Sequence, residues 1–93
     1  MKFLVKANWP NESANEQFAS GKGAETIQGI LEEIKPEAVY FGLEGGERTA
    51  WMIVNADEAS QIPGIAEPLF LGLNARIDIK PIMTPEDLAK AMG

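Results

Sequence analysis

A hairpin whose strands are apolar on both sides is the sequence feature that most constrains this fold. Residues 37–55 read EAVYFGLEGGERTAWMIVN, in which two strand-forming runs flank a pair of glycines. Gly45 and Gly46 supply the positive φ angles that tight hairpin turns require. Successive side chains of a strand point to opposite faces, so a strand with one wet face has a polar residue at every second position. Neither run follows that pattern, so both faces of the hairpin must be covered.

Helices can cover only one face of this hairpin. On the other face we expect one of two sets of side chains, either Ala38, Tyr40 and Met52 or Phe41, Leu43, Trp51 and Ile53. Leaving such groups in water forfeits about 25 cal/mol per Å² of apolar surface, a large share of a small domain's stability. A second copy of the chain, packed sheet to sheet about a two-fold axis, is the simplest cover.

The remaining segments alternate between strand and helix patterns. We expect a strand over residues 2–9, a short helix over 12–19, a kink at SGKG, a helix over 24–35, a broken helical stretch over 56–73, a strand over 74–83 and a short helix over 84–92. Asn11, Asp57 and Thr84 are the expected helix caps. We predict that this broken stretch restarts at Pro63 and at Pro68, and that Pro81 lies at a strand end or on a sheet edge.

This order of elements predicts the fold class. Strand, helix, strand, strand, helix, strand is the βαββαβ arrangement of ferredoxin-like α+β folds. Right-handed crossovers place both helices on one face of a four-stranded antiparallel sheet with strand order 4-1-3-2. We expect residues 1–93 to form a single domain.

The absence of two residue types reduces the kinds of catalytic and metal-binding sites that the chain can form. The chain has no histidine and no cysteine, which removes the usual neutral-pH general base, the commonest metal ligands and any thiol nucleophile. We expect no metal site and no cofactor. The formal net charge of −6 argues against nucleic acid as a partner. The apolar run in MKFLVKANW is too short for a signal peptide or a membrane span, so we expect a cytoplasmic protein that does not enter a membrane.

Basic residues gather on the polar faces of the first and last strands. These faces carry Lys2, Lys6, Arg76 and Lys80, with Asp78 as the only acid. One hypothesis is a site for a small anion, in which Lys6 and Arg76 bind the anion and Asp78 orients them. The alternative is a solvated flank with lysines that discourage strand addition.

Aromatic residues provide a second candidate site. Tyr40 and Trp51 lie on adjacent strands and offer polar atoms beside an apolar surface, as small-molecule sites do. The alternative is that both aromatic residues serve packing in the core or in a dimer. Glu44, Glu47 and Arg48 flank the glycine turn and are interpreted as surface residues of the hairpin tip.

The βαββαβ pattern at this length, with the segments IPGIAEPLF and PIMTPEDL, resembles the dimeric α+β barrel superfamily. Within it, the chain is similar to the small bacterial proteins grouped as the domain of unknown function 3303. The resemblance implies a homodimer and a cleft between each sheet and its own helices or within the barrel. It also implies relatives that are cofactor-independent monooxygenases, isomerases or haem enzymes; Asn8 and Trp9 are of the residue types that the first group uses. The haem enzymes usually rely on a histidine that this chain lacks.

Two functions are therefore expected from the sequence. The first is a homodimer that binds a small anionic or aromatic molecule, with Lys6, Tyr40, Trp51, Arg76 and Asp78 as ligand-binding residues. The second is a cofactor-independent monooxygenase or isomerase that acts on an aromatic or lactone-like substrate. A protein-interaction subunit is a third class. The sequence leaves open whether the protein is an enzyme at all.

Overall fold

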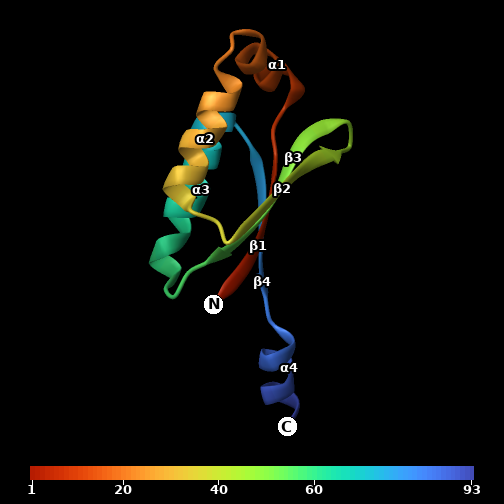
Figure 1. The fold of residues 1–93 in the computed structure, drawn as a ribbon, viewed down its shortest axis with the longest axis vertical. Helices are drawn as coiled ribbons and strands as arrows, with labels where there is room; N and C mark the ends of the chain where they lie inside the picture. Colours follow the sequence, from red (N-terminus) through yellow and green to blue (C-terminus); the bar gives the residue numbers. More distant parts are fainter.

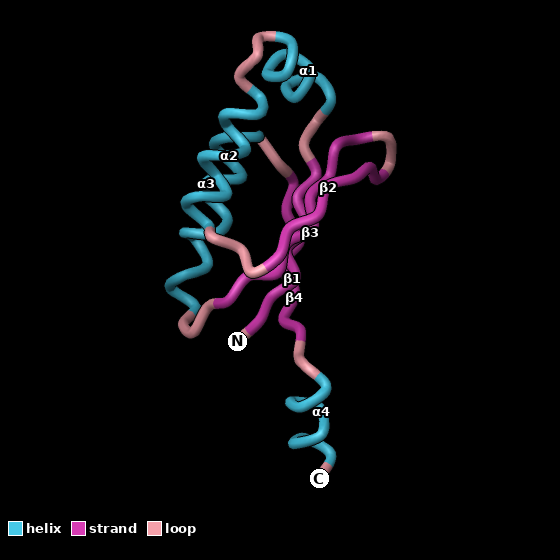
Figure 2. The backbone as a smooth tube through the Cα atoms, viewed as in Figure 1, coloured by secondary structure: helices cyan, strands magenta, loops and turns pink.

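The computed structural model describes residues 1–93 and contains one sheet with helices on one of its faces (Figures 1 and 2). In chain order the elements are β1 (Lys2–Asn8), α1 (Asn11–Ala19), α2 (Gly23–Ile34), β2 (Ala38–Glu44), β3 (Glu47–Asn55), a 3₁₀ turn (Ala59–Gln61), α3 (Ile62–Leu73), β4 (Arg76–Ile82) and α4 (Pro85–Met92). The predicted interruption at the SGKG segment is confirmed, since residues 20–22 separate α1 from α2 and Gly23 begins α2.

The sheet has the order β2-β3-β1-β4, and every pair of neighbours is antiparallel. This is the expected order 4-1-3-2 read from the other edge, so the α+β, ferredoxin-like prediction is confirmed. Pro81 lies in β4, an edge strand, as predicted. An edge strand tolerates proline because it has a partner strand on one side only, so a residue without an amide proton disrupts few hydrogen bonds of the sheet.

The core lies between the sheet and the pair α2 and α3. Val5 of β1 and Met52 of β3 are paired and fully buried, and Leu69 of α3 is buried in the same cluster. This packing uses the alternate residues of each strand that face the helices. The opposite face of the sheet has no helix over it, and we call it the open face. The side chains on the open face are those of Lys2, Leu4, Lys6, Asn8, Ala38, Tyr40, Glu44, Glu47, Thr49, Trp51, Ile53, Asn55, Arg76, Asp78, Lys80 and Ile82.

The register of the hairpin corrects the two sets of side chains expected from the sequence. Tyr40 lies opposite Trp51, and Ala38 lies opposite Ile53, so these residues share the open face. The prediction had placed Tyr40 with Met52 and Trp51 with Phe41. Because only two glycines form the turn, pairing starts at Glu44 and Glu47, and even-numbered residues of β2 face odd-numbered residues of β3.

Helix α3 begins at Ile62, next to the restart predicted at Pro63, and is continuous from there, so the second restart expected at Pro68 is wrong. Pro63 occupies the first turn, where a missing amide proton costs nothing. Pro68 lies inside the helix, which nevertheless keeps its helical path because its apolar face is packed against the core. The buried residues of that face are Ile65, Ala66, Leu69 and Leu73.

Helix caps follow the predictions only in part. Thr84 caps α4 as expected and accepts a hydrogen bond from the Asp87 amide at 3.1 Å. The other two assignments are wrong. The cap of α1 is Pro10, and Asn11 is the first helical residue. Glu58, not Asp57, caps the 3₁₀ turn through a reciprocal pair of bonds with Gln61.

Helix α4 projects away from the rest of the molecule (Figure 1) and has no buried residue. It accounts for much of the molecule's longest dimension in overall extents of 53 × 27 × 17 Å. None of the helices combines the length and the apolar character that crossing a bilayer requires.

Candidate functional site

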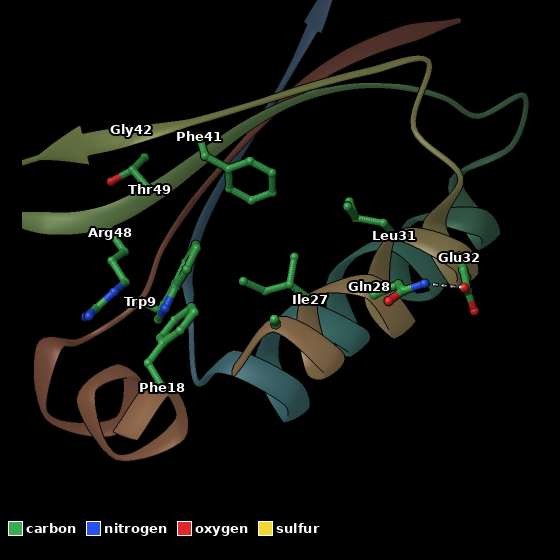
Figure 3. A pocket seen from close by; sticks show the side chains of 11 residues that line it. Trp9, Phe18, Ile27, Gln28, Leu31, Glu32, Phe41, Gly42, Arg48 and Thr49 are labelled. Carbon is green, nitrogen blue, oxygen red and sulfur yellow. Dashed lines mark hydrogen bonds between the residues drawn. The ribbon is translucent and has the colours of Figure 1, made fainter. Parts of the chain in front are cut away.

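A cavity of about 710 Å³ opens between helix α2 and the hairpin (Figure 3), and we call it the helix-side cavity. Its lining residues come from the end of β1, both helices of the first crossover and both hairpin strands. They are Trp9, Phe18, Ala24, Ile27, Gln28, Leu31, Glu32, Phe41, Gly42, Arg48 and Thr49. Most of the wall is therefore aromatic or aliphatic.

The cavity exists because the helices do not cover the outer hairpin strand. Along β2 only the first residues are partly buried, and the rest are exposed. Phe41 belongs to the helix-facing side of β2, yet its side chain is 53% exposed. Ile27 and Leu31 lie across from it on α2, one helical turn apart (Figure 3). The volume between these side chains has no side chain of the chain's own to fill it.

Trp9 forms the inner end of the cavity. It follows β1, and its amide donates a hydrogen bond to the Arg48 carbonyl at 3.2 Å, which ties this end of β1 to β3. The indole is buried to 2% exposure, and its Nε1–H has no acceptor within the chain. A buried donor without a partner costs free energy comparable to a lost hydrogen bond. This atom is therefore a candidate for a group outside the chain to satisfy.

Phe18 is packed against the glycine that begins α2. A Cβ atom added at Gly23 would lie 2.6 Å from Cδ1 of the Phe18 ring, closer than real carbon atoms approach. The second glycine of the SGKG segment therefore leaves room for this ring. Phe18 is 38% exposed and stands beside Trp9 at the same end of the cavity (Figure 3).

Arg48 supplies the positive charge of the helix-side cavity. Its guanidinium carbon lies 4.8 Å from the centroid of the Phe18 ring, a cation–π distance, and its Nη1 donates to Asn15 Oδ1 at 2.9 Å. It forms no ion pair with any carboxylate of the chain. At the other end of the cavity, Gln28 donates to the Glu32 carboxylate at 3.4 Å.

Thr49 is buried where the cavity meets the sheet, and its hydroxyl is fully used. It accepts a hydrogen bond from Asn8 Nδ2 at 2.6 Å and donates to the Glu47 carbonyl at 3.0 Å. Asn8 therefore holds the sheet together, and of Asn8 and Trp9 only Trp9 lines the cavity.

The ligand-binding residues predicted from the sequence lie on the open face. Lys6, Trp51 and Asp78 come together around a hollow of about 210 Å³, whose other lining residues are Leu4, Glu44 and Lys80. Tyr40 lies opposite Trp51 but does not line this hollow, and neither does Arg76.

Carboxylates offset the basic strip formed by β1 and β4. Glu44 lies 2.8 Å from Lys6, and the Lys6–Glu44 hydrogen bond raises the pKa of the Lys6 ammonium. Arg76 pairs with Glu47, so two acids of the hairpin tip neutralise two bases of the strip.

The other two bases of the strip have partners as well. Lys80 lies 3.2 Å from Asp78, and Lys2 pairs with Glu37, whose carboxyl pKa is lowered by hydrogen bonds from Lys2 and Asn55. All four strip cations therefore have a carboxylate partner, whereas Arg48 has none.

The family resemblance implied a cleft between the sheet and its helices or within the barrel, but sequence reasoning did not identify the residues that line the helix-side cavity. Arg48 was interpreted as a surface residue of the hairpin tip, and residues 24–35, which include Ile27 and Leu31, were expected only as a helix on the sheet. The signal that pointed to a cavity was the apolar character of β2 on both faces, because two helices are too few to cover an outer strand as well as the centre of a sheet.

Comparisons with known proteins agree with this fold. The model of a family described as "Domain of unknown function (DUF3303)" matches residues 1–93, so the chain belongs to that family, as the sequence resemblance implied. No curated protein matches the chain. Among solved structures, the chain is similar to 5-chloro-2-hydroxyhydroquinone dehydrochlorinase from Burkholderia phenoliruptrix AC1100, in complex with 2,5-dihydroxybenzoquinone. The TM-score is 0.66 at 15% identity, over 94% of this chain and 98% of the other.

Proposed function

We propose that this member of the DUF3303 family binds a small aromatic molecule in the helix-side cavity. The observation that carries the proposal is the cavity itself, about 710 Å³ in volume and lined mainly by Trp9, Phe18, Phe41, Ile27 and Leu31. Small-molecule sites are concave and mostly apolar, with volumes of roughly 300–1,000 Å³ and a few polar groups that orient the ligand. Arg48 is such a group.

The structural neighbour supports the ligand class. That protein has the same fold and was solved with a substituted benzoquinone, a single six-membered ring with oxygen substituents. A ring of that size fits between Phe41 on the hairpin and Leu31 on α2, where it would contact aromatic and aliphatic groups on both sides.

We further propose that the chain is a homodimer whose protomers meet through their open faces. Four large apolar side chains lie together there without a helix over them, namely those of Leu4, Tyr40, Trp51 and Ile53. Tyr40 is 70% exposed, and its ring is the largest apolar group that pairing would cover. On this proposal Tyr40 and Trp51 stabilise the dimer, and the ligand lies on the other side of the sheet. The open-face hollow around Lys6 and Asp78 stays a predicted anion site, and the cytoplasm stays the predicted compartment.

Calorimetric titration with single-ring aromatic compounds tests the binding proposal. We expect affinities of about 0.1–1 mM for benzoate and benzamide, as befits ligands with so few atoms. Ala24→Phe places a ring inside the cavity and should weaken binding at least tenfold, because Ala24 is an exposed residue of the cavity wall. Ala59→Phe makes the same change at an exposed position outside the cavity and should leave binding unchanged. Equal binding by both variants, or no binding to the wild-type protein, would contradict the proposal.

The proposal is for binding and not for a reaction. Acid–base catalysis requires a titratable group within hydrogen-bond reach of the reacting atom, and the titratable side chains of the cavity are Glu32 and Arg48. The monooxygenase or isomerase alternative stays a prediction. Its test is product analysis by mass spectrometry after incubation with hydroxylated aromatic compounds in air.

A further inference from the structure

We propose that the helix-side cavity selects ligands that carry a negative charge, and that Arg48 is the residue that selects them. This inference rests on the proposed function, since it concerns the ligand class of the same cavity. It names an aromatic carboxylate, phenolate or quinone oxyanion as the preferred chemistry.

The Arg48 guanidinium has hydrogen-bond donors that no group of the chain uses. A guanidinium has five N–H donors, and Arg48 makes one side-chain hydrogen bond, to the neutral amide oxygen of Asn15. Phe18 lies under the guanidinium at 4.8 Å and fixes one face of it. Two neutral partners therefore orient the charge without neutralising it, which leaves donors for a planar anion to accept from in the fork geometry that arginine favours.

The other arginine of the chain and the acids near Arg48 are all engaged in ion pairs. Glu47 is adjacent to Arg48 in sequence but points to the opposite face of β3, where it pairs with Arg76. Glu44, at the other end of the same turn, pairs with Lys6. Of the two arginines, Arg76 has a carboxylate partner and Arg48 has none, although the chain has 14 acidic residues.

Aromatic side chains, and no acidic ones, lie beside the guanidinium in the cavity. Trp9 and Phe18 stand beside Arg48 at the same end of the cavity (Figure 3), and the one acid of the lining, Glu32, is at the other end. A ligand ring between the apolar walls would thus place an anionic substituent at Arg48 and keep it away from Glu32.

Benzoate and benzamide provide a matched pair of probes, because they share a ring and differ in charge. The readout is tryptophan fluorescence in a Trp51→Phe background, where Trp9 is the only remaining indole and lines the cavity. We expect benzoate to bind about tenfold more tightly than benzamide, because a charge-assisted hydrogen bond contributes roughly twice the free energy of a neutral one, a difference that corresponds to about tenfold in affinity. The preference should shrink as ionic strength rises.

Substitutions at Arg48 assign the preference to this residue. Arg48→Gln should reduce the preference for benzoate to about twofold or less while benzamide binding persists, which shows that the cavity is intact. Arg48→Lys should retain part of the preference, because the charge remains but the planar fork is lost. Lys90→Gln removes one positive charge from the exposed helix α4 and should leave the preference unchanged.

Each other outcome overturns a distinct claim. Equal affinity of wild-type protein for both probes, or an unchanged preference in Arg48→Gln, would overturn the charge selection and leave aromatic binding intact. Loss of the preference in Arg76→Gln instead would place the anion on the open face. Binding of neither probe would overturn the proposed function and this inference with it.

Discussion

Tyr40 lies directly opposite Trp51 in the β2–β3 ladder, on the face of the sheet that no helix covers. Cross-strand aromatic pairs stabilise a sheet by roughly 0.2–1 kcal/mol. This gain is small beside the free energy that is lost when the apolar surface of the pair stays in water. The Trp51 ring extends along the face toward Gly42, where an added Cβ atom would lie 3.0 Å from its Cζ3 atom. The pair therefore leaves apolar surface on the open face, which the proposed dimer would cover.

A charge at Tyr40 should dissociate the dimer. Tyr40→Glu would place two carboxylates at the centre of the proposed interface, and central aromatic residues of interfaces contribute about 2 kcal/mol or more. We expect the dimer dissociation constant to rise at least 30-fold, measured by sedimentation velocity at micromolar concentration. Leu71→Glu, at an 85% exposed position on α3, is the control and should leave the dimer intact. A wild-type protein that sediments as a monomer would refute the pairing.

Gly23→Ala should disturb the cavity end at Phe18. The added methyl group overlaps the Phe18 ring, which must leave its position beside Arg48. Overpacking of this kind costs about 1–3 kcal/mol, reduced here because the ring is partly exposed. We expect a stability loss of about 1 kcal/mol in urea unfolding and a change in the Trp9 emission spectrum. An unchanged spectrum together with increased stability would show that Phe18 does not occupy this position.

Two glycines of the helix layer should respond oppositely to alanine. Gly29 lies in α2 with no atom within 4 Å of an added Cβ, so Gly29→Ala should stabilise the protein by about 0.5–1 kcal/mol through helix propensity alone. Gly72 lies in α3 where an added Cβ would be 2.8 Å from Ile30 Cδ1, a buried side chain. Gly72→Ala should therefore bring no such gain, or a loss. Equal gains from both substitutions in urea unfolding would contradict the close approach of α2 and α3.

The Glu37 carboxylate should make stability depend on pH in the acidic range. Hydrogen bonds from Lys2 and Asn55 lower its folded-state pKa below the ordinary value of 4.5. A lowered folded-state pKa means that the contribution is fully present above about pH 4.5 and is lost as pH falls through the folded-state value. The stability difference between wild type and Glu37→Gln should be constant near neutrality and vanish in acid. Glu33→Gln, which breaks no ion pair, is the control for urea unfolding across the pH range. A difference that grows on acidification would reverse the assignment.

Most of the fold follows from local patterns that the sequence states clearly. The alternation of Val5 and Ala7 in β1, the period of Ile27 and Leu31 in α2 and the Gly45–Gly46 turn each have one structural reading. Together they determine the order of elements, and right-handed crossovers then determine the order of strands. The register of the hairpin was predictable too, because a two-residue turn makes Glu44 face Glu47. The prediction missed it by assigning each strand's faces separately.

The site could not be predicted in the same way, because it depends on what is left uncovered. Whether Phe41 is packed or exposed depends on how far α2 extends over the outer strand, which no local pattern encodes. Charge pairing is likewise a tertiary property. The strip that contains Lys6 and Arg76 reads as positive in the sequence, but Glu44 and Glu47 of the hairpin reach both side chains. The break expected at Pro68 failed for a related reason, since packing of one helix face outweighed a local preference.

Methyl-resolved NMR during a titration with benzoate tests whether the ligand binds between α2 and the hairpin, because this measurement locates the ligand as well as detecting it. Ile27 and Leu31 report on the helix-side cavity, and Leu4 and Ile53 report on the open face. We predict that the ring current of the bound probe shifts the methyl signals of Ile27 and Leu31 in proportion to saturation and leaves those of Leu4 and Ile53 in place. Shifts confined to Leu4 and Ile53, or no shifts at millimolar benzoate, would contradict a ligand site between α2 and the hairpin.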